Sequence, residues 1–433
     1  MKRLSFLKAI LIPTFIGTVI ASDKKLLTEK NTLSIMDFGA KGDGIHDDTN
    51  AFKKYLSIHD SLTLPDKKIF KIGSIVLNGK TISGPGKIKI KTGEDCAFIL
   101  EGKNNRIQNI EFVSKGRGQR PESEILLGKT LDFAIISGCI FNGNLFNAIG
   151  SNMNSETDTP YINAPWRSQI IISECKFHGD YLHHLYFHRV ENLLIEKNYF
   201  KNSKQDSIRL RQWVKTINIY NNIFESIGTS TTKDSKDAID CYWSGLELNI
   251  QGNQFSDIST HCLDIKGRSP DQSYGTSRVI ISNNQIRRAG FSGILLSSGS
   301  KTNTGWKALQ YVTVSQNHIE ECGHSTKNSN DAAIFMRHNQ EMISITGNQI
   351  FKNRHKGIML GNFEPSAPNS KNILISGNIL TDNGNYGIHI SGGENVLISN
   401  NILDKNLKGI VAEGYKSFKL LNYIAINNIG DQD

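Results

Sequence analysis

One short pattern returns through most of the chain at intervals of 23 to 33 residues. It reads apolar-x-apolar-x-x-Asn-x-(Phe/Ile/Leu), as in "INIYNNIF" and "LNIQGNQF". The repeated asparagines are Asn198, Asn222, Asn253, Asn284, Asn317, Asn348, Asn378 and Asn401. Two earlier copies carry Cys139 and Cys175 in the asparagine position. A repeat of this length without helical spacing predicts stacked β-strand units.

A second short strand, such as "AIDCYW" or "CLDIKG", is expected between consecutive copies. Apolar and polar residues alternate in both strands, so one face points inward and the other outward. A unit of two or three short strands cannot bury its apolar face alone, whereas stacked units bury a continuous core. The repeats therefore predict an all-β parallel β-helix, and the asparagines are expected to form a ladder of side-chain amides at one turn.

The first residues have the layout of an export signal. Lys2, Arg3 and Lys8 precede the apolar run "AILIPTFIGTVI", which is too short for a comfortable membrane span. We expect residues 1–21 to be a cleaved signal peptide, with an uncleaved anchor as the alternative. Residues 22–433 are then a single domain, periplasmic or secreted, with no membrane contact after cleavage.

Composition limits the partners. The chain has 38 Gly, 9 Pro and a formal charge of +9, which on an exported protein suggests an anionic polymer as partner. Nucleic acid is not expected, because no basic stripe is interleaved with aromatic residues. The six cysteines lack metal-binding spacing; Cys139 and Cys175, stacked on adjacent coils, could form a disulfide or remain a free pair. A monomer is expected, and a trimer stays open.

The most specific motif lies at the start of the expected domain. Residues 34–52 read "SIMDFGAKGDGIHDDTNAF", which resembles the opening signature of the pectate lyase superfamily. The resemblance implies a right-handed parallel β-helix of about a dozen coils. It also implies a first strand, a glycine-rich loop and a short helix that together cap the N-terminal end over residues 34–60. Asp48 or Thr49 suits the N-cap of that helix.

The signature is specific for the fold and unspecific for the chemistry. It is similar to the start of polygalacturonase-like hydrolases, polysaccharide lyases, epimerases and phage tailspike depolymerases. Function therefore has to be inferred from a site.

Aligning the second strand of each coil predicts columns of outward side chains about 4.8 Å apart. One column holds Tyr186, Arg209, Asp240, Asp264, Leu295, Phe335, Met359 and His389. The next holds His188, Arg211, Tyr242, Lys266, Ser297, Arg337, Gly361 and Ser391. A third, at the turn entering the strand, holds His183, Asp206, Asp237, His261, Ser292, Ala332 and Lys356. Charged residues thus gather on the coils of residues 180–268, with an ordinary solvated face as the alternative.

Two pairs of carboxylates stand out in these columns. Asp240 and Asp264 are expected side by side about 5 Å apart, and Asp206 and Asp237 form a second pair. Like charges this close raise each other's pKa, so they need a cation or a shared proton. Such pairs are typical of active sites.

The first functional hypothesis is a calcium-assisted lyase that cleaves an acidic, uronate-containing polysaccharide by β-elimination. The expected Ca²⁺ ligands are Asp206, Asp237, Asp240 and Asp264. Lys266, with a pKa lowered by nearby positive charge, abstracts the C5 proton while Arg211 or Arg268 stabilises the developing charge. The stretches "DAID" and "LDIK" resemble the calcium-and-lysine arrangement of some β-helix pectate lyases.

Three alternatives remain open. Two of the carboxylates could serve as the acid and base, or acid and nucleophile, of a glycoside hydrolase. The Asp-Asp and Gly-His-Gly motifs of family 28 hydrolases are missing from the matching region, which disfavours a polygalacturonase. A uronan C5-epimerase would share the proton abstraction, and a non-catalytic polysaccharide-binding or assembly protein would need none of this chemistry.

Polar and aromatic neighbours of the acids are expected to bind sugar. Rings of tyrosine and tryptophan stack on sugar faces, although ordinary packing explains them equally well. The candidate substrate-binding residues are His183, His188, Arg209, Tyr242, Trp243 and His261.

Overall fold

The computed structural model describes 33–116, 122–151, 166–211, 213–231, 235–242, 246–267, 277–298, 308–325, 331–361, 369–413 and 420–430. Contacts divide the chain into Met1–Ser34 and Ile35–Asp433, and only the second unit is described below. The predicted signal peptide, residues 1–21, lies outside the described residues.

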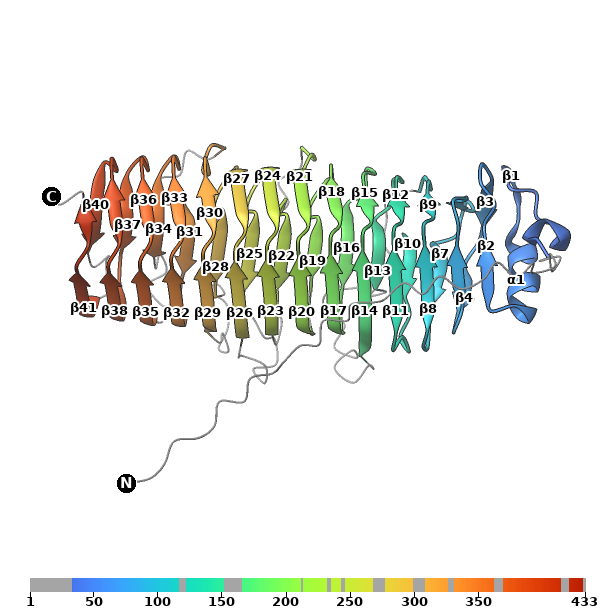
Figure 1. The fold of residues 1–433 in the computed structure, drawn as a ribbon, viewed down its shortest axis with the longest axis horizontal. Helices are drawn as coiled ribbons and strands as arrows, with labels where there is room; N and C mark the ends of the chain where they lie inside the picture. Colours follow the sequence, from blue (N-terminus) through green and yellow to red (C-terminus); the bar gives the residue numbers. More distant parts are fainter. Residues whose placement is uncertain are drawn as a thin grey trace, which may run out of the picture. The chain divides into compact units, whose positions relative to one another are not determined.

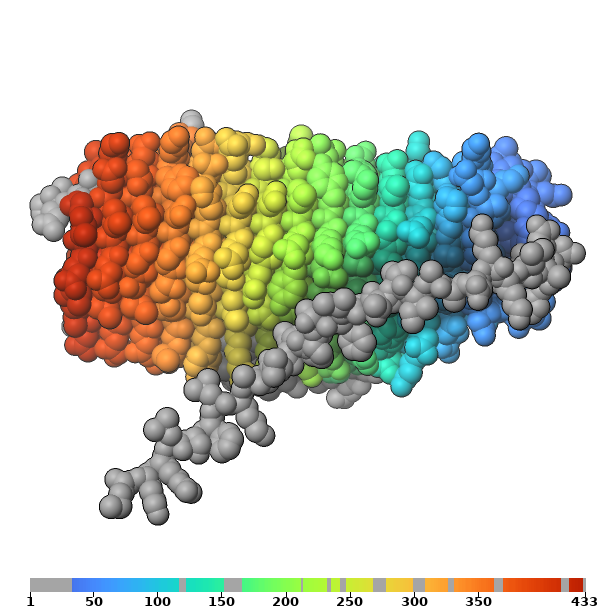
Figure 2. Space-filling view, in the orientation of Figure 1, coloured from blue at the N-terminus to red at the C-terminus, as the bar shows by residue number. Residues whose placement is uncertain are grey.

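The unit from Ile35 onward is a right-handed parallel β-solenoid of about a dozen coils (Figure 1). Each complete coil sends one strand to each of three parallel sheets, and successive coils add neighbouring strands to the same sheets. The coils therefore follow one another in sequence order along the surface (Figure 2). The predicted fold is confirmed, and the stacking that it requires places residues of adjacent coils side by side.

The site discussed below lies on the 13-stranded sheet, called here the site sheet. Its described strands are β4 (Ile75–Leu77), β7 (Cys96–Leu100), β10 (Ser123–Leu127), β13 (Asn147–Ser151), β16 (His183–Phe187), β19 (Ile208–Leu210), β22 (Ile239–Tyr242), β25 (Leu263–Lys266), β28 (Ile294–Ser297), β31 (Ala332–Arg337), β34 (Lys356–Gly361), β37 (Tyr386–Ile390) and β40 (Lys408–Ala412).

The 15-stranded sheet comprises, in the described chain, β1 (Asp43–Asp47), β3 (Ile69–Ile72), β6 (Lys87–Ile90), β9 (Glu111–Phe112), β12 (Ile140–Phe141), β15 (Lys176–Phe177), β18 (Tyr199–Lys201), β21 (Ile223–Ile227), β24 (Gln254–Ile258), β27 (Gln285–Ala289), β30 (His318–Glu320), β33 (Gln349–Phe351), β36 (Ile379–Thr381), β39 (Ile402–Asp404) and β42 (Ile429–Gly430).

The 14-stranded sheet comprises, over the same described residues, β2 (Ser61–Thr63), β5 (Thr81–Ser83), β8 (Asn105–Gln108), β11 (Ala134–Ser137), β14 (Arg167–Ser173), β17 (Val190–Glu196), β20 (Val214–Tyr220), β23 (Leu246–Gln251), β26 (Ser277–Ser282), β29 (Leu309–Ser315), β32 (Gln340–Thr346), β35 (Lys371–Ser376), β38 (Gly393–Ser399) and β41 (Leu420–Ile426).

The N-terminal segment differs in part from the expected order. The residues before the glycine-rich loop form a short 3-10 helix, η1 (Ile35–Phe38), rather than a strand, and β1 lies within the predicted loop. The helix α1 (Thr49–Ile58) follows, and its apolar face is buried. Asp48 precedes the helix without capping it, because its carboxylate accepts bonds from the backbone of the loop. Protection of the first coil by α1 remains a prediction.

The asparagine ladder is confirmed. From Asn222 to Asn428, each side-chain Oδ1 accepts a hydrogen bond of 2.9–3.0 Å from the backbone N–H of the asparagine one coil earlier. The Nδ2 of each of these earlier asparagines donates to the same oxygen. Cys175, one coil before the ladder, donates its backbone N–H to Asn198. The ladder satisfies buried polar groups along the length of the turn.

Aromatic rings stack beside this ladder in the core. Phe112, Phe141, Phe177, Phe200, Phe224 and Phe255 lie on successive coils, with ring centroids 4.7–4.9 Å apart and nearly parallel planes. This spacing is the separation of neighbouring strands.

All six cysteines are free and buried, so Cys139 and Cys175 do not form a disulfide. In the described part of the chain, no helix has the length and apolar character needed to cross a membrane.

Candidate functional site: an acid cluster on adjacent coils

The predicted column of outward residues exists on the site sheet. Arg209 of β19 pairs with Asp240 of β22, and Asp240 pairs with Asp264 of β25. Tyr186 precedes Arg209 in the same register, and Leu295 follows Asp264. The inward neighbours of the two acids belong to the main apolar core, which fixes the register and holds the acids on the outer face.

The turn before each strand contributes the second pair of acids. Asp206 and Asp237 lie just before β19 and β22, and both are buried. The backbone N–H of Asp237 donates to Asp206 Oδ1 at 2.9 Å, and the N–H of His261 donates to Asp237 Oδ1 at 2.9 Å. These carboxylates therefore tie each turn to the turn of the neighbouring coil.

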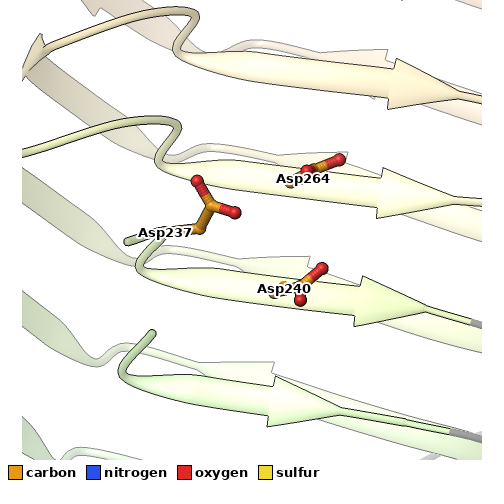
Figure 3. Close-up of side chains that lie close together, drawn as sticks. All are labelled: Asp237, Asp240 and Asp264. Carbon is orange, nitrogen blue, oxygen red and sulfur yellow. The ribbon is translucent and has the colours of Figure 1, made fainter. Parts of the chain in front are cut away.

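Three of the four predicted metal ligands converge. Asp237, Asp240 and Asp264 each offer an oxygen, and these oxygens all lie within 4.8 Å of one another (Figure 3). The three residues are at most 6% exposed. Their donor type suits Ca²⁺, which binds carboxylate oxygens. Asp206 is not part of this group; its Oδ2 lies 3.4 Å from Arg209 Nε instead.

Lys266 lies in the position that a metal ion would need. Its Nζ is 2.7 Å from Asp240 Oδ1 and 2.5 Å from Asp264 Oδ2. The shorter of these distances lies within the roughly 2.3–2.6 Å expected for calcium–oxygen bonds, and the longer one lies just above that range. While Lys266 holds both carboxylates, the cluster as it stands does not fit a calcium ion.

Two arginines complete the charge balance around Asp240. Arg211 Nη2 lies 3.4 Å from Asp240 Oδ2, and Arg209 Nε lies 3.6 Å from the same oxygen. Asp240 is buried, yet it faces three cationic side chains. The buried carboxylate is therefore stabilised by charges from the preceding coil, Arg209 and Arg211, and from the following coil, Lys266.

The two stacked acids have opposite pKa shifts. Burial would raise the pKa of Asp240, but the charges of Lys266 and Arg211 outweigh it and the pKa is lowered. Burial raises the pKa of Asp264 to about 6, with Lys266 opposing and the neighbouring acids adding to the shift. The environment therefore separates one ionised acid from one that holds its proton to higher pH.

The pKa of Lys266 corrects one expectation. Burial would lower it, but the charges of Asp240, Asp264 and Asp237 outweigh burial and raise the pKa above that of an ordinary lysine. The predicted lowering by local positive charge is wrong for this arrangement, because Nζ contacts two carboxylates, Asp240 at 2.7 Å and Asp264 at 2.5 Å. A lysine held in this way is a poor general base.

The candidate histidines lie at the edge of the cluster. His183 is buried; its Nε2 accepts from Arg209 Nη1 at 3.3 Å, which leaves Nδ1 to donate to the backbone oxygen of Asp206 at 3.2 Å. His188 is also buried and packs edge-on against Tyr186. His261 accepts a bond from the backbone of the next coil through Nδ1. Their contact with a sugar remains a prediction.

Three candidate site residues lie wholly or partly outside the described residues. The backbone of Tyr242 pairs with Lys266 as predicted, but its side chain, Trp243 and Arg268 lie outside the described residues. The exposed parts of the described site are Lys266, whose side chain is 22% exposed, and Arg209, at 15%. These two side chains mark where the cluster meets the surface.

Beyond Asp264 the outward column turns apolar. Leu295, Phe335 and Met359 succeed one another in register and, with Ala332, form an apolar cluster separate from the main core. The outward column predicted from the sequence already included Leu295, Phe335 and Met359. The charged cluster is thus bounded on its C-terminal side.

One buried acid escaped the sequence reasoning. Glu124 of β10 is fully buried and accepts bonds from Ser114 Oγ at 2.5 Å and Tyr181 Oη at 3.1 Å. Burial raises its pKa to about 7. The sequence did carry a signal of this acid: Glu124 directly precedes the apolar run 125–127 of the same short strand. Its partners lie outside the strands, Ser114 after β9 and Tyr181 before β16, so the bonds tie segments of different coils together, which indicates a structural role.

The fold and the stacked acids together describe a β-solenoid with a buried ionic cluster on one sheet. A family model described as "Right handed beta helix region" matches residues 73–305 and 237–429. The chain belongs to this family. A search of curated proteins found no match.

Solved structures show the same fold at low identity. One is a mutant tailspike protein of E. coli bacteriophage HK620 in complex with a pentasaccharide, with TM-score 0.58 and 12% identity, covering 88% of this chain and 77% of that one. Another is the catalytic unit of a thermostable GH87 alpha-1,3-glucanase from Streptomyces thermodiastaticus, with TM-score 0.52 and 14% identity, covering 93% and 70%. The fold implied by the pectate lyase superfamily resemblance is confirmed.

Proposed function

We propose that this protein is an enzyme that cleaves glycosidic bonds in a polysaccharide, with Asp264 as the acid and Asp240 as its ionised partner. The observation that carries the proposal is the opposite pKa shift of two carboxyl groups stacked on adjacent coils. Pairs of acids whose environments separate their pKa values are the usual arrangement in glycoside hydrolases.

The hydrogen bonds leave one oxygen of each acid for chemistry. Lys266 binds Asp240 Oδ1 and Asp264 Oδ2. Asp240 Oδ2 and Asp264 Oδ1 accept no hydrogen bond from the described residues, although Arg211 and Arg209 face Asp240 Oδ2 at 3.4 and 3.6 Å. Both oxygens are buried, so productive binding requires the partly exposed Arg209 side chain, 3.6 Å from Asp240 Oδ2, to move aside.

The spacing of the acids favours a double displacement. Their oxygens lie within 4.8 Å, closer than the ~6.5–9.5 Å between carboxyl groups that leaves room for an attacking water in inverting enzymes. In the proposed reaction, Asp264 gives its proton to the glycosidic oxygen as the C–O bond breaks, and Asp240 bonds to the anomeric carbon. Water, deprotonated by Asp264, then releases the sugar with retained configuration.

Two further facts support a polysaccharide substrate. The similar structures include a tailspike with bound pentasaccharide and an alpha-1,3-glucanase. The net charge of +9 favours an anionic polymer over a neutral one. The signal peptide expected from the sequence supports a periplasmic or secreted location for the proposed activity.

The test is a panel of neutral and acidic polysaccharides, assayed both for new reducing ends and for the ultraviolet absorbance of unsaturated uronates. Hydrolysis predicts reducing ends without the absorbance, and Asp240→Asn and Asp264→Asn are each expected to abolish their release. Cleavage that persists in both variants would refute the assignment.

Calcium-assisted elimination is the second candidate, because three buried carboxylates converge on one point. It requires Lys266 to leave Asp240 and Asp264 before a metal ion can bind them. Absorbance by the products, together with loss of activity in a chelator, would select this candidate over hydrolysis.

A further inference from the structure

The acid cluster carries its own cation. Lys266 is two residues after Asp264 on β25, so both side chains leave the same face of the strand. Lys266 pairs in register with Tyr242, and Asp240 is therefore its diagonal neighbour on the preceding coil. A long side chain reaches such a diagonal position, which explains how one ammonium contacts acids of two coils.

The ammonium contacts two of the three carboxylates that a metal ion would bind. Its two contacts, 2.7 and 2.5 Å, are made to oxygens that belong to the trio of convergent acids. The third acid, Asp237, is held by other donors: Ser235 Oγ at 2.5 Å, Thr260 Oγ1 at 2.5 Å and the N–H of His261 at 2.9 Å. Each acid of the trio is thus engaged without a metal.

The positive charges around Asp240 also disfavour a bound metal ion. Asp240 already lies within 3.6 Å of Arg209 and Arg211 in addition to Lys266. A divalent ion added to this cluster would lie close to three positive charges at low exposure, where repulsion is weakly screened. The ion could enter only if Lys266 moved into solvent, and this exchange would replace a tethered cation by one that must be taken from solution.

We propose that Lys266 is the permanent counter-ion of the Asp237–Asp240–Asp264 cluster, that it excludes Ca²⁺ from the native protein, and that removing its charge creates a calcium site. The proposal is independent of whether the cluster cleaves a glycosidic bond, since it concerns occupancy of the cluster. It also distinguishes this chain from a protein that needs calcium for activity.

The experiment compares calcium binding by the full chain and by Lys266→Met, using titration calorimetry and the thermal unfolding midpoint at a fixed scan rate. The wild type is expected to show no binding heat and no shift of the midpoint in millimolar Ca²⁺. Lys266→Met is expected to bind Ca²⁺ and to gain about 3 °C or more at saturating ion, because a ligand that binds only the folded state stabilises it.

Two controls identify the site. Lys266→Met combined with Asp264→Asn should lose the calcium response, because one of the ligands is gone. Lys266→Arg should behave as the wild type, because it keeps a cation at the cluster. If Lys266→Met does not fold, Lys266→Gln serves in the same titration.

Two results would overturn the proposal. One is calcium binding by the wild type that Asp264→Asn abolishes, which would mean that Lys266 does not exclude the ion. The other is a folded charge-removed variant that gains no calcium response. Since neither readout depends on turnover, failure here is distinct from failure of the proposed hydrolysis.

Discussion

The asparagine ladder and the Asp240–Asp264 column are produced by the same stacking of coils, and they differ in whether neighbours satisfy one another. In the ladder, Asn253 accepts from Asn222 and donates to Asn284. An amide carries both donors and an acceptor, so identical residues can repeat without limit. An ionised carboxylate only accepts, so two stacked aspartates need cations or protons from elsewhere.

The cations that balance the acids lie on the coils that carry or flank them. Lys266, Arg209 and Arg211 approach the acids there, and Asp264 keeps a raised pKa despite them. Further along the same column, Leu295 and Phe335 are uncharged and pack in an apolar cluster, so they need no balancing charge. A long ladder of amides is therefore explained by its role in stabilising the fold. Two stacked acids, followed in the same column by apolar residues, are not needed for the fold and indicate a functional site.

The largest expected effect is on activity. Asp264→Asn keeps the size of the side chain but cannot donate the proton, so turnover should fall by about 10²–10⁴-fold. Initial rates on a cleaved polysaccharide would measure it. Asp257→Asn is the matched control, since Asp257 pairs with Arg288 on an exposed surface of another sheet; equal losses in both variants would remove the special role of Asp264.

Next in size is the loss of the central cation. In calcium-free buffer, Lys266→Met should lower the free energy of unfolding by about 3 kcal/mol, because it leaves buried carboxylates without their partner. Denaturant unfolding gives the value. Lys215→Met breaks an ion pair of the same 2.7 Å length with Glu191, but Lys215 is 51% exposed, so its cost should stay below about 1 kcal/mol. Similar costs would show that burial of the cluster does not matter.

The ladder predicts a smaller stability effect and none on chemistry. Asn284→Ala removes the acceptor of Asn253 and leaves buried groups unpaired, which should cost about 1–3 kcal/mol. Asn395→Gly breaks two exposed bonds, to Asn372 and from Asn422, and glycine tolerates the φ of 55° at this position, so stability should change by less than about 0.5 kcal/mol. The comparison would be broken if Asn284→Ala changed the rate constant of cleavage as strongly as Asp264→Asn.

The smallest effect is a pH dependence that the ladder lacks. The pKa of Asp264 rises from 3.8 to about 6 on folding. Protonated Asp264 therefore favours the folded state, and its contribution is complete below pH 3.8 and lost as the pH rises through about 6. Between about pH 4 and pH 7, Asp264→Asn should lose roughly 1–2 kcal/mol less stability than the wild type. Parallel stability curves would contradict the raised pKa.

The repeat, the alternation within it and the family resemblance of residues 34–52 were together sufficient to predict the fold and the column. Inward apolar residues fix which side chains face outward, and strand spacing then places Asp240 beside Asp264. The path of the Lys266 side chain was not predictable, because it depends on a diagonal contact between coils rather than on register. The direction of its pKa was therefore misjudged. Asp237 is a member of the trio, but its bonds to Ser235 and Thr260 arise from turn geometry that the repeat does not encode.

The most direct test is a carboxyl-carbon NMR titration of aspartate-labelled protein, with Asp240→Asn and Asp264→Asn used to assign the two signals. The account predicts that Asp264 titrates near pH 6 and that Asp240 remains ionised below the ordinary range of aspartate. If both carboxyl groups titrate together near the ordinary aspartate value of about 3.9, the two stacked acids are equivalent and the proposed division of roles is wrong.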